Sequence, residues 1–278
     1  MEGQMSTSIM GILNLTPDSF SDGGRFDDDA GTVDVASAVT EALRMTQLGA
    51  AMIDVGGEST RPGAEPTPVA EEQRRILPVL KELLGCGITV SVDTRRAATA
   101  LAALQCADRA GVDPRTLTIN DVSGALTDPA MPELIAESGA QIVITHNRGD
   151  AQSMGALTDY DSLLEDVTAE LLAVRGSYLH AGARREQLIL DPGIGFSKTH
   201  EQNWELVRGL ETFVRLGHRV LFGASRKGFL APVSSGETRD TATAVLSAIA
   251  AQAGVWGVRV HDVQASLDAV QVIAKLRS

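Results

Sequence analysis

The sequence predicts a single-domain (β/α)8 TIM barrel, an α/β fold in which eight parallel strands alternate with helices. The length of 278 residues suits one such barrel, which needs ~250 residues, although two small domains would also fit. Hydrophobic residues make up 44% of the chain and aromatic residues only 4%, as expected of short parallel strands packed by helices. The third observation is a recurring pattern, a short apolar run followed by a polar residue and a glycine or proline turn.

The clearest copy of this pattern is the stretch Leu188-Ile-Leu-Asp-Pro-Gly-Ile-Gly-Phe196. Its first three residues predict a short buried strand that ends at Asp191. Pro192 has a fixed φ angle and no backbone donor, and the two glycines allow dihedral angles that a Cβ atom would forbid, so the chain turns sharply here. Active sites lie at this end of the strands in α/β barrels and open α/β sheets, which makes Asp191 a candidate for chemistry.

Each predicted strand is an apolar run that ends at a polar residue or a glycine turn. In chain order the strands cover about residues 9–13, 51–55, 88–92, 116–119, 141–145, 188–190, 219–224 and 258–260. The runs are short and rich in Val, Ile and Leu, which is typical of parallel strands buried on both faces.

Helices are predicted between the strands, where apolar residues recur at helical spacing. They cover about residues 32–48, 69–84, 96–107, 129–138, 161–181, part of 200–216, 240–253 and 263–276. Gly49 is expected to end the first helix and Pro78 to kink the second, and Asp240 and Thr241 are candidates to cap the seventh. Without a break in composition these units make one domain over residues 1–278, with 1–8 as a flexible N-terminal tail.

Two long polar loops follow the first two strands. Such loops are uncommon in compact domains unless they are functional or disordered, so both are expected to be mobile. Phe20 and Phe26 in the first loop either anchor it to the barrel rim or cover a ring-shaped substrate. Thr60 and Arg61 in the second loop suit an anion, or merely keep the loop soluble.

The composition excludes several classes of partner. A net charge of −12 provides no basic face for nucleic acid or an anionic membrane, although a few cations at one mouth can still hold an anionic small substrate. Cys86 and Cys106 lack a CxxC spacing and are expected to be reduced packing residues. The N-terminus does not resemble a signal peptide, and polar residues interrupt the apolar stretch 242–260, so the sequence indicates a cytoplasmic protein without a membrane span.

If the barrel closes, the polar residues at the strand exits form two chemically different sets. The first contains neutral and cationic donors around strands 1, 2 and 8, which are neighbours in a closed barrel. Its members are Asn14, Thr60, Arg61, Arg259 and His261. These donors suit a phosphate or pyrophosphate, and Arg259 and His261 share one face of their strand because they are two residues apart.

The second set combines two carboxylates, an amide and an ammonium from strands 3, 4, 6 and 7. Its members are Asp93, Asn120, Asp191 and Lys227. This mixture suits a flat heterocycle with ring N–H donors and a carbonyl acceptor, each charged hydrogen bond being worth roughly 1.5–3 kcal/mol. Two structural alternatives remain open, a salt bridge between Asp93 and Lys227 and a purely structural His146. We find no zinc-type ligand spacing, Ser-His-Asp set or P-loop.

Seven ordered motifs carry a resemblance that covers essentially the whole chain. They are Gly11-Ile-Leu-Asn-Leu-Thr-Pro-Asp-Ser-Phe-Ser-Asp22, Asp54-Val-Gly-Gly-Glu-Ser-Thr-Arg-Pro-Gly63, Ser91-Val-Asp-Thr94, Ile119-Asn-Asp-Val-Ser-Gly124, Asp191-Pro-Gly-Ile-Gly-Phe196, Ser225-Arg-Lys227 and Arg259-Val-His-Asp-Val263. The chain resembles dihydropteroate synthase, a (β/α)8 barrel of folate biosynthesis. The resemblance implies condensation of 6-hydroxymethyl-7,8-dihydropterin pyrophosphate with 4-aminobenzoate to give 7,8-dihydropteroate and pyrophosphate. It also implies Mg²⁺ as cofactor, a homodimer built from late helices, and sulfonamides as competitive inhibitors.

The resemblance further implies roles for individual residues. The catalytic residues would be Asp93, Asn14, Lys227 and Arg61, and Asn14 would hold the metal. The pterin would bind Asp93, Asn120, Asp191 and Lys227. The pyrophosphate would bind Asn14, Thr60, Arg61, Arg259 and His261. The 4-aminobenzoate pocket would contain Phe20, Pro62, Ser225, Arg226 and Gly228.

The chemistry of these substrates favours a dissociative displacement. Pyrophosphate leaves readily once Mg²⁺, Arg and His neutralise its charge, and the dihydropterin can delocalise positive charge on its exocyclic methylene. Asp93 can stabilise that charge from nearby. An aromatic amine is neutral at pH 7 and can attack without a strong general base. For a dissociative displacement of this kind, the pterin is expected to bind before 4-aminobenzoate.

Two positions depart from the family pattern. Asn147 replaces the usual Met and changes the pterin floor, and Gly228 replaces the usual Ser or Arg and changes the 4-aminobenzoate rim. We therefore expect 4-aminobenzoate and sulfonamides to bind more weakly than they would to a Gly228→Ser variant. Two rival functions remain open. A corrinoid-dependent methyltetrahydrofolate methyltransferase needs no pyrophosphate site, so Arg259 and His261 argue against it; the other rival is a non-catalytic pterin-binding homologue.

Overall fold

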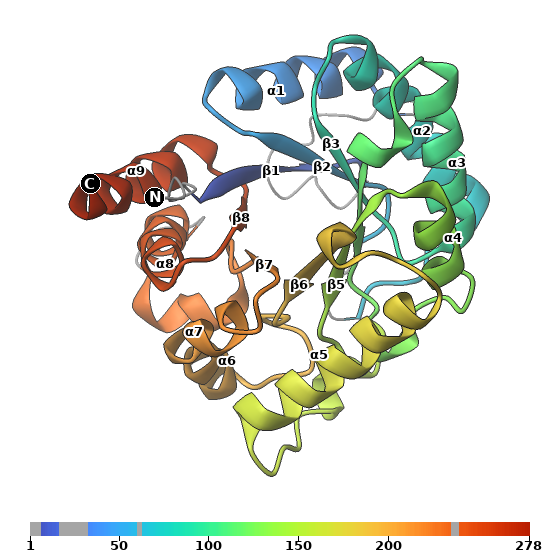
Figure 1. Cartoon of the computed structure of the whole chain (residues 1–278). Coiled ribbons are helices and arrows are strands. Elements are labelled where there is room, and N and C mark those ends of the chain that lie inside the picture. Colours follow the sequence, from blue (N-terminus) through green and yellow to red (C-terminus); the bar gives the residue numbers. More distant parts are fainter. Residues whose placement is uncertain (1–6, 17–32, 60–62, 235–238) are drawn as a thin grey trace.

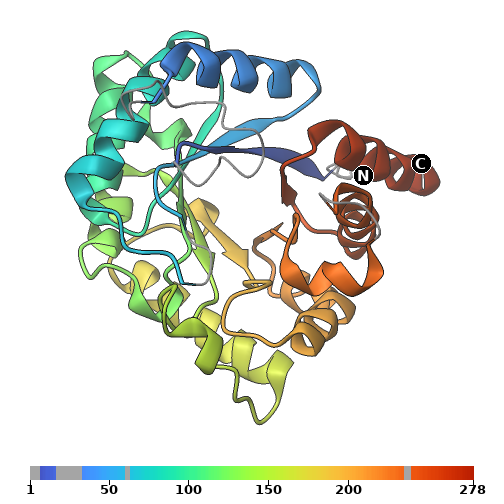
Figure 2. The same cartoon turned by 180° about the vertical axis from the view of Figure 1, so that it is seen from behind.

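The eight strands close into the predicted barrel, and the helices surround it (Figure 1 and Figure 2). The structure is a computed structural model that describes residues 7–16, 33–59, 63–234 and 239–278. The strands are β1 (Ser8–Asn14), β2 (Met52–Gly56), β3 (Val90–Asp93), β4 (Thr118–Asp121), β5 (Gln141–Thr145), β6 (Leu188–Asp191), β7 (Arg219–Phe222) and β8 (Gly257–Val260). All pair in parallel in sequence order, and β8 pairs with β1 to close the barrel.

Helices follow the strands, as the apolar spacing predicts. They are α1 (Val35–Gln47), α2 (Val69–Gly85), α3 (Ala97–Arg109), α4 (Met131–Ser138), α5 (Leu163–His180), α6 (His200–Arg208), α7 (Leu210–Val214), α8 (Asp240–Ala253) and α9 (Val263–Arg277). The helical segment within 200–216 is divided at Gly209, where a Cβ atom would lie only 2.5 Å from Leu164 Cδ2. A short 3₁₀ helix, η6 (Gly228–Val233), follows the exit of β7.

Two details of the sequence prediction are wrong. Asp240 and Thr241 do not cap α8, because the helix begins at Asp240 and the preceding residue, Arg239, adopts a left-handed φ of 59°. Cys106 is buried and free, as expected of a packing residue, whereas Cys86 is free but exposed at the end of α2. Within the described part of the chain, no helix is both long and apolar enough to cross a lipid bilayer.

The lower half of the barrel interior is apolar. Met10, Met52, Val143, Ile189 and Leu221 form a separate buried cluster inside the barrel, with Trp256 packed against it. A larger apolar cluster, which includes residues of all eight strands and of the helices, forms the main core. Burial of this core supplies most of the stabilisation. The polar side chains lie beyond the apolar cluster inside the barrel, at the carboxyl ends of the strands.

Strand register brings the predicted residues to one level of this mouth. Asn14 is paired with Gly56, Gly56 with Asp93, and Asp93 with Asn120, so the four positions form a row across β1 to β4. On the other side of the barrel Asp191 is paired with Thr145. Because side chains alternate along a strand, members of such a row face the same way. The strand register therefore brings residues from motifs that are distant in the sequence close together in space.

Candidate active site

A cavity of about 720 Å³ opens at the carboxyl ends of the strands. Most of the candidates that the structure describes line it: Asn14, Asp93, Ser225, Arg226, Lys227, Gly228, Arg259 and His261. Asn120 and Asp191 are not in its wall but lie directly beneath, where they are 2% and 8% exposed. Phe20, Thr60, Arg61 and Pro62, also predicted from the sequence, lie outside the described residues.

Arg259 connects the two sets of residues that the sequence separated. Its Nε atom donates to Asp54 Oδ2 at 2.6 Å, and its Nη2 atom donates to Asp93 Oδ2 at 2.9 Å. The amide of Asn120 donates to the same Asp54 oxygen at 3.0 Å. Asp93 therefore pairs with Arg259, and among the described residues the alternative salt bridge between Asp93 and Lys227 does not form.

Asp93 is the carboxylate whose environment is most unusual. Burial raises its pKa to about 7, and the negative charges of Asp54 and nearby acids add to this effect while Arg259 opposes it. Across the row, a Cβ atom built on Gly56 would lie 3.7 Å from both Asp93 Oδ2 and Asn14 Oδ1. Glycine at this position thus leaves a gap between Asn14 and Asp93 that a Cβ atom would fill at van der Waals distance.

Lys227 lines the other side of the cavity, and Asp191 lies beneath its wall. The Asp191 Oδ1 atom accepts the backbone N–H of Gly193 at 2.7 Å, which orients the carboxylate at the sharp turn predicted from the sequence. The Lys227 ammonium donates to the carbonyl of Ile194 and lies 4.3 Å from the centre of the Phe196 ring. Burial lowers the pKa of Lys227 to about 8, although the charge of Asp191 opposes the shift. Burial also raises the pKa of Asp191, against the effect of Lys227.

The turn after β7 joins the strand-8 residues to this wall. Ser225 Oγ lies 2.8 Å from His261 Nδ1 and accepts the backbone N–H of His261 at 3.1 Å. The serine oxygen therefore contacts both the backbone and the ring of His261 and fixes the orientation of the imidazole. Arg226 instead forms a bidentate pair with Asp240 at 2.7 and 2.9 Å. Ser225 thus orients His261, and Arg226 anchors the turn to α8.

His146 has the structural role that the sequence left open. Its Nε2 atom lies 3.0 Å from Glu170 Oε2, and its Nδ1 atom lies 2.8 Å from the ammonium of Lys198. Burial, followed by the charge of Lys198, lowers the pKa of His146 to about 3, so the imidazole is neutral. Lys198 also donates to the carbonyls of Gly193 and Phe196 at 3.1 and 2.9 Å. The chain of contacts therefore stabilises the loop that carries Asp191.

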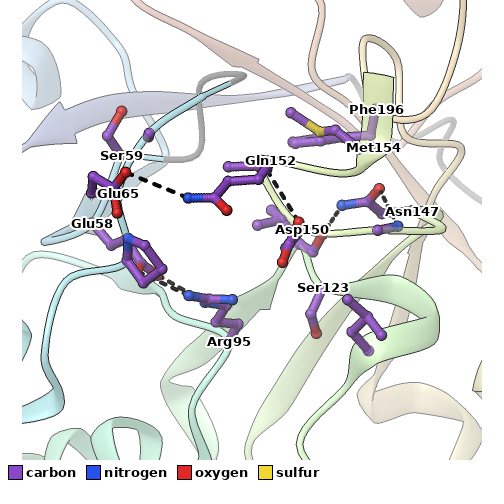
Figure 3. A pocket seen from close by; sticks show the side chains of 16 residues that line it. Glu58, Ser59, Glu65, Arg95, Ser123, Asn147, Asp150, Gln152, Met154 and Phe196 are labelled. Atoms are coloured by element: carbon purple, nitrogen blue, oxygen red, sulfur yellow. Dashed lines mark hydrogen bonds and ion pairs between the residues drawn. The ribbon is translucent and has the colours of Figure 1, made fainter. Parts of the chain in front are cut away.

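A smaller pocket lies beside the main cavity, among the loops that follow β2, β4 and β5 (Figure 3). Asn147, in its wall, is buried and makes three side-chain hydrogen bonds: Oδ1 accepts from Ser197 Oγ at 2.9 Å and from the backbone N–H of Gly149 at 3.3 Å, and Nδ2 donates to the Val122 carbonyl at 3.1 Å. Where the resemblance predicts an apolar Met, this chain therefore has an amide that links the exits of β4, β5 and β6.

Glu58, in the same wall, holds the base of the loop after β2. Its carboxylate accepts from the guanidinium groups of Arg95 and Arg96 and from the backbone N–H of Thr67 (Figure 3 shows the Arg95 pair). Farther along the loop, the backbone N–H of Gly63 donates to the Ala151 carbonyl at 2.8 Å. The described ends of this loop are thus tied both to β3 and to the loop after β5.

Sequence reasoning missed Asp54 and Lys198. Asp54 is completely buried, yet a carboxylate in the middle of the apolar run Met52-Ile-Asp-Val is itself a signal, because residues two apart in a barrel strand share the interior. Lys198 follows the glycine turn of β6 and is buried, but nothing in the local sequence distinguishes it from an exposed loop lysine.

Comparison with known proteins identifies the family and the fold of the chain. A sequence profile described as pterin binding enzyme matches residues 10–261. A dihydropteroate synthase of Mycobacterium leprae is 46% identical over 274 residues, which cover 95% of this chain and 92% of the relative. A crystal structure of a dihydropteroate synthase from Clostridium difficile, determined in the presence of pteroic acid, superposes with a TM-score of 0.86 at 36% identity, covering 99% of this chain and 98% of the other. For the Yersinia pestis dihydropteroate synthase in a sulfonamide complex the TM-score is 0.87, the identity 33% and the coverage 98% and 94%.

Proposed function

The chain belongs to the pterin binding enzymes, and within them to the dihydropteroate synthases, and from this premise we propose that it condenses 6-hydroxymethyl-7,8-dihydropterin pyrophosphate with 4-aminobenzoate. As a member of that family it is a transferase of folate biosynthesis. The observation that carries the proposal is the contact between Arg259 and Asp93, because it brings a cation suited to pyrophosphate against a carboxylate suited to a pterin. A methyltransferase needs no pyrophosphate site, so the cation Arg259 favours the synthase over that rival.

In the proposed complex each wall of the cavity has one task. Asp93, Asn120, Asp191 and Lys227 bind the pterin ring, and Arg259 and His261 bind the pyrophosphate together with Thr60 and Arg61. The amine approaches over the turn that contains Ser225 and Gly228, and Phe20 and Pro62 are proposed as further contacts. Arg259 must exchange part of its bonding to Asp93 for bonding to the leaving group, and this would expose the Asp93 carboxylate to the developing cation. Sulfonamides, which resemble 4-aminobenzoate, are the expected competitive inhibitors.

We propose that the displacement is dissociative, with the bond to pyrophosphate breaking before the amine attacks. The closeness of Asp93 to the pyrophosphate-binding Arg259 supports this order, because a carboxylate placed there favours a cation on the pterin methylene. The test uses pterin pyrophosphate with deuterium at that methylene, while both dihydropteroate and pyrophosphate are quantified. A normal secondary isotope effect on kcat/KM is expected. An effect near unity would favour concerted displacement, and absence of product from the unlabelled substrates would reject the proposed function itself.

Activity is expected to depend on the ionisation of Asp93. Its pKa of about 7 predicts that kcat/KM for the pterin pyrophosphate rises between about pH 6 and pH 8 and then levels, since the carboxylate is the active form. Stability should change in the opposite direction. The folded state retains the Asp93 proton up to about pH 7 and the unfolded state only up to about pH 4, so ionisation in this window destabilises the fold by a few kcal/mol.

Asp93→Asn is the matched variant for this test. Its residual activity should lack the rise near pH 7, and its unfolding free energy should fall less between pH 4 and pH 7 than that of the wild type. A wild-type pH profile that survives in Asp93→Asn would assign the ionisation to another group.

We propose Mg²⁺ as the cofactor, with Asn14 as its protein ligand. Mg²⁺ commonly keeps several waters and binds substrate phosphates with one or two protein oxygens, and the Asn14 amide oxygen beside the anion site fits that use. Within the described residues no group of three acidic, histidine or cysteine side chains gathers into a metal cage, which agrees with an ion that enters with the pyrophosphate. Bound there, Mg²⁺ would neutralise charge on the leaving group. Titrating wild type and Asn14→Ala with the pterin pyrophosphate should show Mg²⁺-dependent affinity only in the wild type; equal dependence would place the ion elsewhere.

We further propose that the chain is a homodimer in the cytoplasm and that α8 and α9 form its interface. These two helices pack side by side next to β8 and β1 (Figure 1). Val245 and Ile249 on α8, and Val272 and Leu276 on α9, are exposed and four residues apart in each helix, which places each pair on one face. Sedimentation velocity should give a dimer for the wild type and a monomer for Val272→Glu, and a monomeric wild type would refute this interface.

A further inference from the structure

An imidazole lies beside the position that a side chain of residue 228 would occupy. His200, the first residue of α6, lines the cavity together with Lys227 and Gly228. A Cβ atom built on Gly228 would lie 3.6 Å from His200 Nε2 and within 4 Å of no other non-neighbouring atom. Gly228 is not among the residues with positive φ, so its backbone accepts a side chain without strain. The space left by this glycine is therefore bounded by the His200 ring.

The position of His200 is determined by the turn that begins α6. The Thr199 hydroxyl accepts the backbone N–H of Gln202 at 3.2 Å, and the Gln202 side chain accepts the backbone N–H of Thr199 at 2.8 Å, a reciprocal capping box. Asn203 in the same turn accepts the backbone N–H of Gly195 at 2.6 Å. The turn is thus bound to the loop after β6, and it holds His200 at the rim on the side of Lys227.

Neighbouring cations at this rim are already engaged. The Arg226 guanidinium pairs with Asp240, and the Lys227 ammonium points inward to the Ile194 carbonyl. Arg239 donates to the Arg226 carbonyl at 3.1 Å. The His200 ring, in contrast, is exposed and has no hydrogen-bond partner within the described part of the chain. Its Nε2 atom is therefore available to an acceptor on a ligand.

We propose that His200 is a specificity-determining residue that binds the carboxylate of the aromatic amine substrate. The inference rests on the proposed function. The amine nitrogen must approach the pterin methylene near Asp93 and Arg259, so the para-carboxylate of a rigid ring must point away from them, toward the rim. A donor beside Gly228 meets that carboxylate, and the imidazole thereby takes over the task that a hydroxyl at position 228 would have.

The proposal changes what is expected of Gly228→Ser. With His200 present, an added hydroxyl beside Nε2 bonds to the imidazole as readily as to the substrate, so the variant should change the KM for 4-aminobenzoate by no more than about twofold. Without His200, the hydroxyl becomes the available donor. The gain that the sequence alone predicted for Gly228→Ser is therefore conditional on residue 200.

Steady-state kinetics of His200→Leu, Gly228→Ser and the double variant test this. His200→Leu should raise the KM for 4-aminobenzoate about tenfold, the effect of one hydrogen bond to a charged acceptor, while kcat and the KM for the pterin pyrophosphate change by less than about twofold. The double variant should recover most of the loss. Aniline, an amine without the carboxylate, should react equally well with wild type and His200→Leu, and His200→Gln, which keeps a neutral donor, should fall between them.

An unchanged KM for 4-aminobenzoate in folded His200→Leu would overturn the assignment. So would an equal loss with aniline, because it would show that His200 acts on the ring or on the fold. Failure of the proposed function is distinguishable from both results, since the wild-type protein itself would then form no product from the two substrates.

Discussion

Asp191→Ala is expected to abolish turnover, and the main cause should be lost affinity for the pterin. Asp191 is buried at the exit of β6, its Oδ1 atom accepts the N–H of Gly193 at 2.7 Å, and the charge of the Lys227 ammonium acts on it. Removing one charge-assisted pair with the heterocycle should weaken binding about 10–100-fold. Calorimetric titration with 6-hydroxymethyl-7,8-dihydropterin measures the loss directly.

Asp191→Asn is the matched control for this prediction. It keeps the size of the side chain and one acceptor for Gly193 but removes the charge, so its affinity should lie between those of wild type and Asp191→Ala. Asp191→Ala should also lose some stability, because the buried N–H of Gly193 loses its acceptor, whereas Asp191→Asn keeps an acceptor and should lose less. Unchanged pterin affinity in folded Asp191→Ala would contradict the assignment of Asp191 to pterin binding.

Arg259→Ala should have the largest effect on stability. Asp54 is fully buried and Asp93 nearly so, and Arg259 is the cation between them. Removing one partner of a buried ion pair typically costs about 3–5 kcal/mol, because the remaining charges lose their compensation. Urea unfolding of the variant should show this loss, and part of it should return when Asp93→Asn is added.

The same variant separates the two ligand sites. Arg259→Ala should weaken the pterin pyrophosphate far more than free hydroxymethylpterin. His261→Ala is the control, because His261 is held by Ser225 and contacts neither carboxylate through a hydrogen bond in the described residues, so it should lose affinity for the ester at little cost in stability. Equal losses for the two ligands in both variants would assign these residues to the pterin instead.

The barrel could be predicted from the sequence because each βα unit carries its own signal. An apolar run, a polar exit and a glycine or proline turn are local features, and parallel pairing brings the exits to one edge. The positions of Asn14, Asp93 and Asn120 at the mouth are predictable for this reason, although Asn14 is expected in a different set from the other two. The strand register, which local patterns do not contain, aligns all three in one row.

Contacts between distant residues could not be predicted. Arg259 was assigned to an anion set and Asp93 to a heterocycle set, yet the two are hydrogen-bonded across the barrel. Lys198 and His200 lie in the loop after β6 and at the start of α6, where a lysine and a histidine are ordinary surface residues by sequence. Only the fold shows that one is buried against His146 and that the other borders Gly228.

The residues proposed to bind the two substrates lie at different depths in the mouth, and they therefore differ in how readily they can change during evolution. Asp93 and Asn120, which would recognise the pterin, are buried at strand ends and hydrogen-bonded to Arg259 and Asp54, so a change there disturbs the fold. Positions 200 and 228, which would recognise the amine, are exposed at the first residues of α6 and η6, and substitutions at exposed positions usually change stability by less than ~0.5 kcal/mol. Substitutions that weaken binding of an inhibitory analogue of the amine can thus occur at the rim while the protein stays folded. Substitutions that weaken binding of an analogue of the pterin would change residues on which the stability of the barrel depends.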